Sequence, residues 1–247
     1  MTKTVQTIDA LSSRLDEIRG RVADCAVRAG RTPAEVTLIA VSKTHSAEMV
    51  RQAIAAGVSD FGENRVQEAE EKIETIRRDA PAGGAQAPRW HLIGHLQSNK
   101  ARRAVKLFDM IHAVDSAELV ERLDRMCKEE GRDELQVLFQ VDLAGEATKA
   151  GAREDILPEL IAKAATCEHV RLAGLMTLPP FYEDAERVRP FFRRLRELRD
   201  ELRERGAFRD GRGELSMGMS HDYEVAIAEG ATMVRIGTAI FGEREQR

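Results

Sequence analysis

Cysteine is scarce in this sequence of 247 residues. The three cysteines, Cys25, Cys127 and Cys167, are odd in number and scattered along the chain, and no Cys-x-x-Cys pair occurs. Disulfide frameworks and cysteine-based zinc sites need paired cysteines at characteristic spacings. The sequence therefore argues against both, and a reducing cytoplasm is the expected location.

Long hydrophobic runs and an excess of one charge are also lacking. No apolar run approaches the roughly 20 residues that a membrane-spanning helix needs, and residues 1–22 predict an amphipathic helix rather than a secretion signal. The 38 Lys and Arg residues nearly balance 42 Asp and Glu residues, for a net charge of −4. This balance disfavours a polyanion as the main partner. We expect a soluble, intracellular protein that binds neither nucleic acid nor a membrane.

Strand-like and helix-like segments alternate along most of the chain. Short apolar segments rich in β-branched residues indicate strands, and such alternation implies a parallel sheet. Eight units in about 250 residues match the size of a (β/α)8 barrel. The eight strand candidates are residues 36–43, 58–64, 90–95, 110–116, 135–143, 170–178, 214–220 and 232–242. We therefore predict an α/β fold, a (β/α)8 TIM barrel with an extra N-terminal helix.

An open, doubly wound sheet is the competing architecture. Such sheets usually carry G-x-G-x-x-G after the first strand, and this motif does not occur here. The segments "AIAAGVSDFGEN" and "AIAEGATMVRIG" resemble each other, each with a helix end, a glycine and a strand. This similarity favours repeated units and hence the barrel.

Lys43 ends the first strand candidate. The carboxyl ends of the strands form the active face of a barrel, and the other polar residues expected there are Asn64, His95, Asp115, Asp142, Thr177, Ser220 and residues 235–238. A charged ammonium at a barrel mouth is costly unless it is paired or loses its proton. A neutral lysine amine is a nucleophile that forms an imine with an aldehyde. The alternative is a lysine that merely points to water.

The segment "VRIGTAIFG" predicts an anion site. Gly237 and Thr238 follow a buried strand, where a glycine lets an oxyanion approach backbone N–H groups and a threonine adds a hydroxyl donor. Barrel phosphate sites often follow strands seven and eight, and Ser220 ends the seventh candidate. Arg235 lies inside the eighth and cannot shed its charge. It needs a partner, either a barrel carboxylate or a ligand atom.

A lysine, an arginine and a phosphate site on one barrel face predict an aldehyde-bearing phosphorylated cofactor. Pyridoxal 5′-phosphate has these features. Lys43 would form a Schiff base with its aldehyde. Ser220, Gly237 and Thr238 would hold its phosphate, and Arg235 would face its pyridine nitrogen.

His91 and His95 in "WHLIGH" suggest a metal pair at first sight. Their spacing suits a helix, whereas the segment predicts a strand, and no third ligand at a clear spacing is visible. We predict no metal site. Met217 and Met219 are assigned to packing, although one of them could touch a bound ring.

Several blocks of sequence resemble one known family. The blocks are "LIAVSKTHS", "FGENRVQE", "WHLIGHLQSNK", "FQVDLAGEATKAG", "GLMTLPP" and "LSMGMSHDYEVAIAEGATMVRIGTAIFG", and their order along nearly the whole chain makes the resemblance specific. The family is that of the pyridoxal phosphate homeostasis proteins (YggS/PROSC).

The resemblance implies a single barrel domain over residues 1–247, similar to the N-terminal domain of bacterial alanine racemase and to the fold-type III class of barrels that bind this cofactor. It implies cofactor attachment at Lys43, phosphate contacts at Ser220, Gly237 and Thr238, the ring nitrogen near Arg235, and Asn64 near the cofactor. These roles are expectations for the structure.

Two functions remain open at the level of sequence. The first is a non-enzymatic protein that binds, buffers or delivers pyridoxal phosphate, with apoenzymes that depend on it as possible recipients. The second is an amino-acid racemase or another enzyme that depends on this cofactor. Racemisation needs a base on each face of the substrate carbon, and neither Tyr182 nor Tyr223 matches the family's second base. The chain also leaves no room for a racemase's second, β-rich domain after the eighth strand, so we expect the first function, and a monomer.

Overall fold

Eight parallel strands form a closed barrel in the computed structural model, which describes residues 2–79, 87–145, 150–209 and 211–242. Each strand pairs with the next along the chain, and β8 pairs with β1 to close the ring, with Ile39 opposite Arg235. The strands are β1 (Thr37–Val41), β2 (Asp60–Glu63), β3 (Arg89–Leu92), β4 (Met110–Val114), β5 (Leu135–Gln140), β6 (Val170–Met176), β7 (Glu214–Met219) and β8 (Met233–Ile236). The predicted (β/α)8 barrel is confirmed, and the open-sheet alternative is wrong.

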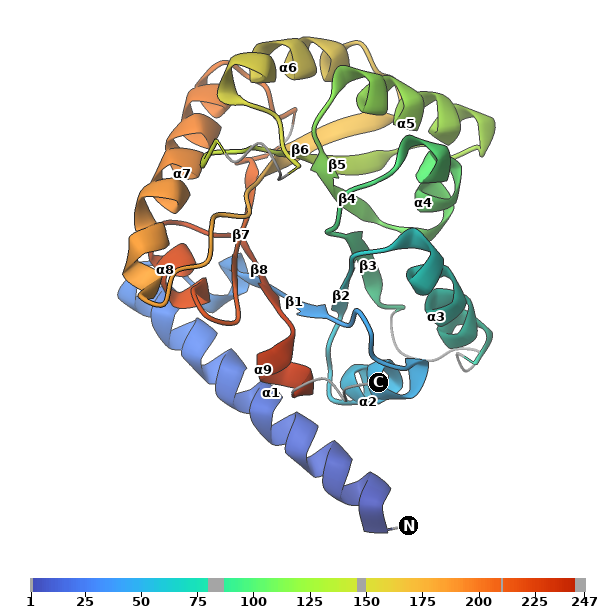
Figure 1. Ribbon diagram of the computed structural model, residues 1–247, viewed down its shortest axis with the longest axis vertical. Coiled ribbons are helices and arrows are strands. Elements are labelled where there is room, and N and C mark those ends of the chain that lie inside the picture. The colour runs from blue at the N-terminus through green and yellow to red at the C-terminus, as the bar shows by residue number, and fades with distance from the viewer. Residues whose placement is uncertain (1, 80–86, 146–149, 210, 243–247) are drawn as a thin grey trace.

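Helices surround the strands on the outside (Figure 1). The α-helices are α1 (Thr2–Arg28), α2 (Ala47–Ala55), α3 (Val66–Arg78), α4 (Ala101–Leu107), α5 (Ala117–Glu129), α6 (Leu157–Ala165), α7 (Arg189–Glu204), α8 (Tyr223–Ala228) and α9 (Thr238–Phe241). Short 3-10 helices lie at Pro33–Glu35 (η1), Ser98–Lys100 (η2), Glu154–Ile156 (η3) and Ala185–Val188 (η4). The predicted extra N-terminal helix is α1, which extends beyond the barrel (Figure 1).

Local sequence signals set several of these boundaries. The Ser46 side chain accepts a hydrogen bond from the Met49 backbone N–H at 3.3 Å and so begins α2, because a serine oxygen satisfies one of the free donors of the first turn. Gly57 follows α2 with a φ of +81°, a conformation that glycine adopts without steric cost. The eighth strand is shorter than predicted, because residues 238–241 form α9.

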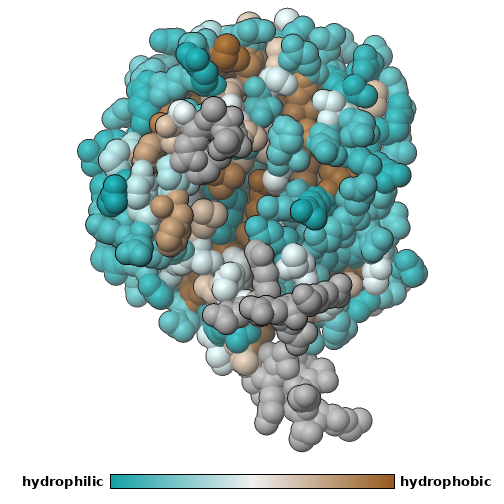
Figure 2. Space-filling model, viewed as in Figure 1, coloured by the Kyte–Doolittle hydropathy of each residue, from teal (hydrophilic) through white to brown (hydrophobic). Residues whose placement is uncertain are grey.

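Apolar side chains fill two layers. The larger layer lies between the strands and the surrounding helices. A smaller cluster inside the barrel contains Ile39, Met110, Leu138, Met176 and Met233, each at most 6% exposed. In the view of Figure 2, hydrophilic side chains dominate the outline of the molecule and hydrophobic ones gather nearer its centre. Within the described part of the chain, no helix is long and apolar enough to cross a membrane.

Candidate functional site at the barrel mouth

Lys43 lies at the barrel mouth, two residues after the end of β1. Its side chain is half-buried, and Thr44 next to it has a φ of +67° in the left-handed region. The Thr44 backbone N–H donates to the carboxylate of Glu68 on α3. Threonine adopts this conformation only when its surroundings impose it. The turn that presents Lys43 is therefore held in place by α3.

A buried cluster that we call the clamp consists of Ser42, Glu63 and Lys72. It holds Ser42, the residue before Lys43. The Ser42 hydroxyl donates to Glu63 Oε1 at 2.7 Å, and Lys72 Nζ donates to the same oxygen at 2.5 Å. Lys72 also donates to the Ser42 backbone carbonyl at 2.7 Å. Burial raises the pKa of the Glu63 carboxyl, although the ammonium of Lys72 opposes that rise. The clamp thus fixes both the side chain and the backbone of Ser42 on the outer side of the strands, next to α3.

The residues predicted to bind phosphate lie together. The Ser220 hydroxyl, just after β7, accepts a hydrogen bond from the Gly237 backbone N–H at 3.3 Å. Gly237 lies between β8 and α9, and Thr238, the first residue of α9, is exposed. A Cβ atom added at Gly237 would lie 3.3 Å from the Val41 carbonyl oxygen of β1. The loops after β7 and β8 therefore meet beside the strand that leads to Lys43.

Arg235 is buried in β8, with only 3% of its surface exposed. Its Nη1 donates to the Ser216 hydroxyl at 2.5 Å, and its Nη2 donates to the Thr177 backbone carbonyl at 2.9 Å. Burial lowers the pKa of Arg235 to about 10, with the charge of Asp222 opposing that change, so the guanidinium stays protonated near neutral pH. The carboxylate partner considered from the sequence is absent from these hydrogen bonds, and both acceptors are neutral oxygens.

Behind Arg235, a chain of buried polar side chains crosses the barrel interior, and sequence reasoning missed most of it. The Ser216 hydroxyl lies 2.9 Å from Nδ1 of His112, and His112 Nε2 lies 3.0 Å from Nδ1 of His91. His91 Nε2 lies 2.9 Å from Asp60 Oδ1. We call Asp60, His91, His112 and Ser216 the relay. A histidine or serine inside an otherwise apolar strand is the signal that could have revealed it.

The two histidines weighed as a metal pair lie in different environments. His91 belongs to the relay, whereas His95 is exposed, with Nδ1 3.8 Å from the Asp115 carboxylate. Over residues 2–79, 87–145, 150–209 and 211–242, no group of three or more His, Cys, Asp or Glu side chains is arranged to hold a metal ion.

Asn64 directly follows β2, and its side-chain oxygen is buried without a hydrogen-bond partner. A Cβ atom at Gly94 would lie 2.4 Å from the Asn64 backbone oxygen, so only a glycine allows the loops after β2 and β3 to approach this closely. Among the other strand-end residues, Asp142 accepts backbone hydrogen bonds from residues 144 and 145 of its own loop. The Thr177 hydroxyl donates to the Val141 carbonyl at 3.0 Å.

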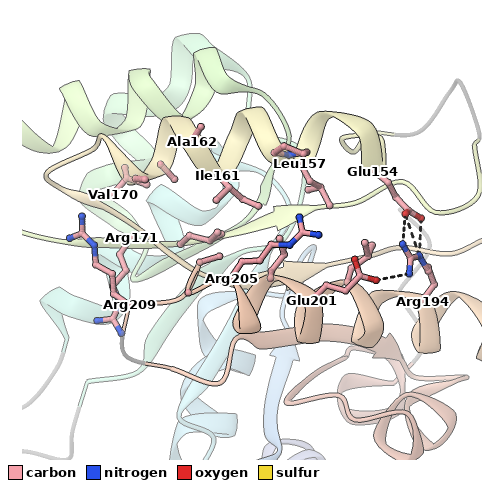
Figure 3. Close-up of a pocket in the computed structure, with 18 residues that line it drawn as sticks. Glu154, Leu157, Ile161, Ala162, Val170, Arg171, Arg194, Glu201, Arg205 and Arg209 are labelled. Carbon is pink, nitrogen blue, oxygen red and sulfur yellow. Dashed lines mark hydrogen bonds and ion pairs between the residues drawn. The ribbon is translucent and has the colours of Figure 1, made fainter.

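A groove of about 610 Å³ lies away from the mouth, between α6 and α7 (Figure 3). Leu157, Ile161 and Leu198 line it, and an ion pair between Arg194 and Glu154 closes one end at 2.9 Å. None of the predicted site residues lines this groove. It is therefore separate from the candidate site.

Comparison with known proteins agrees with this geometry. The family model for the N-terminal domain of alanine racemase matches residues 14–245. A pyridoxal phosphate homeostasis protein of Aquifex aeolicus is 40% identical over 232 residues, which cover 94% of this chain and 97% of that protein. The chain belongs to the pyridoxal phosphate homeostasis protein family. The resemblance seen in the sequence is confirmed.

Solved structures extend the comparison for this family member. PipY of Synechococcus elongatus without pyridoxal phosphate matches with a TM-score of 0.80 and 41% identity, covering 94% of this chain and 100% of that one. PipY with the cofactor bound matches with a TM-score of 0.77 and 39% identity. An alanine racemase of Clostridium difficile shares the fold, with a TM-score of 0.70 and 17% identity, but the match covers only 58% of the racemase chain.

Proposed function

We propose that this chain binds pyridoxal 5′-phosphate at the barrel mouth through Lys43 and takes part in the homeostasis of that cofactor, holding and delivering it rather than using it in catalysis. The observation that carries the proposal is the hydrogen bond between Ser220 and Gly237. It joins the loops after β7 and β8 into one anion-binding corner beside β1. PipY, which carries the cofactor in one of its structures, supports the assignment.

The residues at the mouth fit the chemical groups of this cofactor. When bound, the cofactor supplies an aldehyde that condenses with a primary amine. Lys43 offers that amine, while Ser220 and Thr238 offer hydroxyl donors for a phosphate beside Gly237. The buried side-chain oxygen of Asn64 is a hydrogen-bond acceptor without a partner. Because buried polar groups are normally hydrogen-bonded, a donor group of a bound cofactor would satisfy it.

Arg235 is suited to the ring nitrogen. Its guanidinium is a permanent donor at neutral pH, and its two hydrogen bonds to Ser216 and Thr177 hold it in place without a neighbouring carboxylate acceptor. A donor at the pyridine nitrogen disfavours protonation of that nitrogen and so weakens the ring as an electron sink. This arrangement suits cofactor binding, and because alanine racemase resembles it at this point, it does not by itself separate binding from racemisation.

The tyrosines support a non-enzymatic role. Racemisation requires a base on each side of the substrate carbon. The ring of Tyr223 is buried in the outer layer, with the Arg21 guanidinium of α1 5.8 Å from its centre. Tyr182 stacks on Phe191, and Arg187 lies 4.3 Å from the centre of its ring. Both rings are thus engaged on the outside of the barrel wall, and the racemase is the minority alternative.

Borohydride reduction tests the proposal. The purified protein is loaded with the cofactor, its absorption spectrum is recorded before and after reduction, and the modified peptide is mapped. We expect the label on Lys43, and we expect Lys43→Ala to lose both the label and the yellow absorption band while remaining folded. Pyridoxal without the phosphate serves as a matched ligand and should bind more weakly.

Two results would contradict the proposal. A label on Lys100 or Lys149 instead of Lys43 would place the cofactor elsewhere. Deuterium exchange at the α-carbon of alanine, at ordinary enzyme rates and dependent on Lys43, would favour the racemase.

A further inference from the structure

The relay joins two ends of the barrel that differ in their access to solvent. At one end, Ser216 holds Arg235 in the interior below the mouth. At the other end, Asp60 begins β2 and forms an ion pair with Arg89 at 2.7 Å. Arg19, Asp60 and Arg89 line a cavity of about 490 Å³ at the amino ends of β1, β2 and β3. The Arg89 side chain is 57% exposed. The end of the barrel at the amino ends of the strands is therefore close to water, whereas the relay is buried in the interior.

The charge of Asp60 sets the direction of every hydrogen bond in the relay. Hydrogen bonds from His91, Ser59 and Arg89 outweigh burial and lower the pKa of Asp60 to about 2, so its carboxylate only accepts. His91 Nε2 must then carry a hydrogen. With both rings neutral, His91 Nδ1 accepts from His112 Nε2–H, and His112 Nδ1 accepts from the Ser216 hydroxyl. The Ser216 oxygen is left to accept from Arg235.

The four side chains of the relay, together with Arg235, allow a second arrangement with one more proton. One proton taken up from solvent is shared out along the relay, so that His112 Nδ1 carries hydrogen and donates it to the Ser216 oxygen. The Nε2 proton of His112 then passes to His91 Nδ1. Each bond that breaks is replaced by one that forms, and the net result is one added proton on His91, beside the Asp60 carboxylate. The hydrogen bond between His112 and Ser216 is now reversed.

We propose that the relay is a positioning device for Arg235, and that a proton stored at its His91 end changes how Arg235 meets the ring nitrogen of the cofactor. In the neutral arrangement, the Ser216 oxygen accepts from Arg235 alone and holds it firmly. In the protonated arrangement, the same oxygen accepts from both Arg235 and His112, and its own hydrogen loses its acceptor. The hold on Arg235 weakens as a result. The proposal rests on the proposed function, since it concerns the same cofactor site.

Of the charged groups around the relay, the Asp60 carboxylate is the one that His91 contacts directly. Asp60 and Arg89 face His91 from β2 and β3, while Arg235 faces the opposite end from β8, with Asp222 acting on it from the loop before α8. Burial, together with the charges of His91 and Arg235, lowers the pKa of His112 well below its ordinary value. His112 therefore passes protons on and does not keep a second one.

Nuclear magnetic resonance of the cofactor-free protein tests the relay directly. Imidazole ¹⁵N shifts report which ring nitrogen carries hydrogen. When spectra are recorded from about pH 8.5 down to about pH 6, we expect His112 to change from the Nε2–H to the Nδ1–H form. His169, which lies just before β6 and outside the relay, is the internal reference, and its variant His169→Gln should leave the other signals unchanged.

Cofactor binding to Asp60 variants provides the second readout. Asp60→Asn keeps an oxygen that accepts from His91 but removes the charge that stabilises the added proton. The wild-type protein should bind the cofactor roughly threefold to tenfold more weakly at about pH 6 than at about pH 8.5, the size of one weakened hydrogen bond. Asp60→Asn should bind the cofactor with wild-type affinity at about pH 8.5. Its affinity should not fall when the pH is lowered to about 6. Asp60→Ala should bind weakly at both values.

The outcomes separate the relay from the proposed function. A His112 ring that keeps Nε2–H at both pH values, or an Asp60→Asn variant with the wild-type pH profile, would overturn the relay while leaving cofactor binding intact. Failure of the wild-type protein to bind the cofactor would overturn the proposed function, and the tautomer measurement would still decide the relay.

Discussion

The clamp and the relay are two buried polar clusters that start on the same strand, β2, and lie on opposite sides of the barrel wall. In the clamp, opposite charges meet directly, with Lys72 Nζ 2.5 Å from Glu63 Oε1. In the relay, the charges of Asp60 and Arg235 stand at the two ends, and neutral groups separate them. Both clusters are closed off from solvent, so the difference lies in how the charge is compensated.

This difference predicts different behaviour. A direct ion pair in a buried site has one favourable proton arrangement, because losing either charge leaves the other uncompensated. Neutral imidazoles each have two tautomers, so a chain of them can reverse its direction without moving its heavy atoms. The clamp is therefore suited to hold the turn of Lys43 in one geometry, while the relay is suited to respond to a proton.

Replacing Lys72 by methionine should break the clamp and cause the largest loss. Methionine has nearly the same length but leaves the Glu63 carboxylate buried without its cation. Removing one partner of a buried ion pair typically costs about 3–5 kcal/mol. We expect a loss of that size in the free energy of unfolding, measured by urea denaturation near neutral pH.

The pH dependence of that loss identifies its cause. Burial already raises the pKa of Glu63, and removal of Lys72 raises it further. A carboxyl whose folded-state pKa lies above its unfolded value contributes stability at low pH that is lost as pH rises through the folded pKa. The loss in Lys72→Met should therefore shrink on acidification, and adding Glu63→Gln should restore most of the stability. A loss independent of pH would mean that the carboxylate is not responsible.

The barrel and most of the candidate mouth could be predicted from the sequence. The alternation of short apolar segments with helical ones carries the architecture. Asn64 and Ser220 directly follow strands and Lys43 lies two residues after one, so topology alone brings them to one end. The end of β8 was predicted too late, since residues 239–241 are apolar and predict a strand, whereas β8 ends at Ile236 and α9 begins at Thr238.

The relay could not be predicted in the same way. His112 and Ser216 lie 104 residues apart, and they meet only because β4 and β7 face each other across the barrel interior. Which residues of β7 point inward depends on an irregularity in its pairing with β8, between Ser216 and Met219. Such register shifts leave no periodic signal in the sequence. Sequence reasoning weighed His91 only as a metal ligand, because the strands that bring its relay partners to it lie far apart along the chain.

Ser216→Ala should have the next largest effect and sharpen the contrast. The substitution removes an acceptor from Arg235 and a donor from His112 in a site with no exposure. Leaving such buried groups unsatisfied costs about 1–3 kcal/mol. We expect a loss of stability in that range and a cofactor affinity that no longer depends on the protonation of the relay. Unchanged affinity at all pH values, relative to the wild-type protein, would show that Arg235 does not need this hydroxyl.

Ser42→Ala is the matched substitution in the clamp and should have the smallest effect. Ser42 is as buried as Ser216, and the same hydroxyl is removed. The Glu63 oxygen that loses it still accepts from Lys72, and the Ser42 backbone carbonyl keeps its own bond from Lys72. We expect a loss of about 1 kcal/mol, near the ordinary net value of one hydrogen bond, with labelling of Lys43 and the pH profile of cofactor binding unchanged. Thermal unfolding and borohydride labelling measure the two quantities on one sample. If Ser42→Ala altered the pH profile as Ser216→Ala does, the two clusters would be coupled through the barrel wall, and the distinction between a fixed clamp and a responsive relay would not hold.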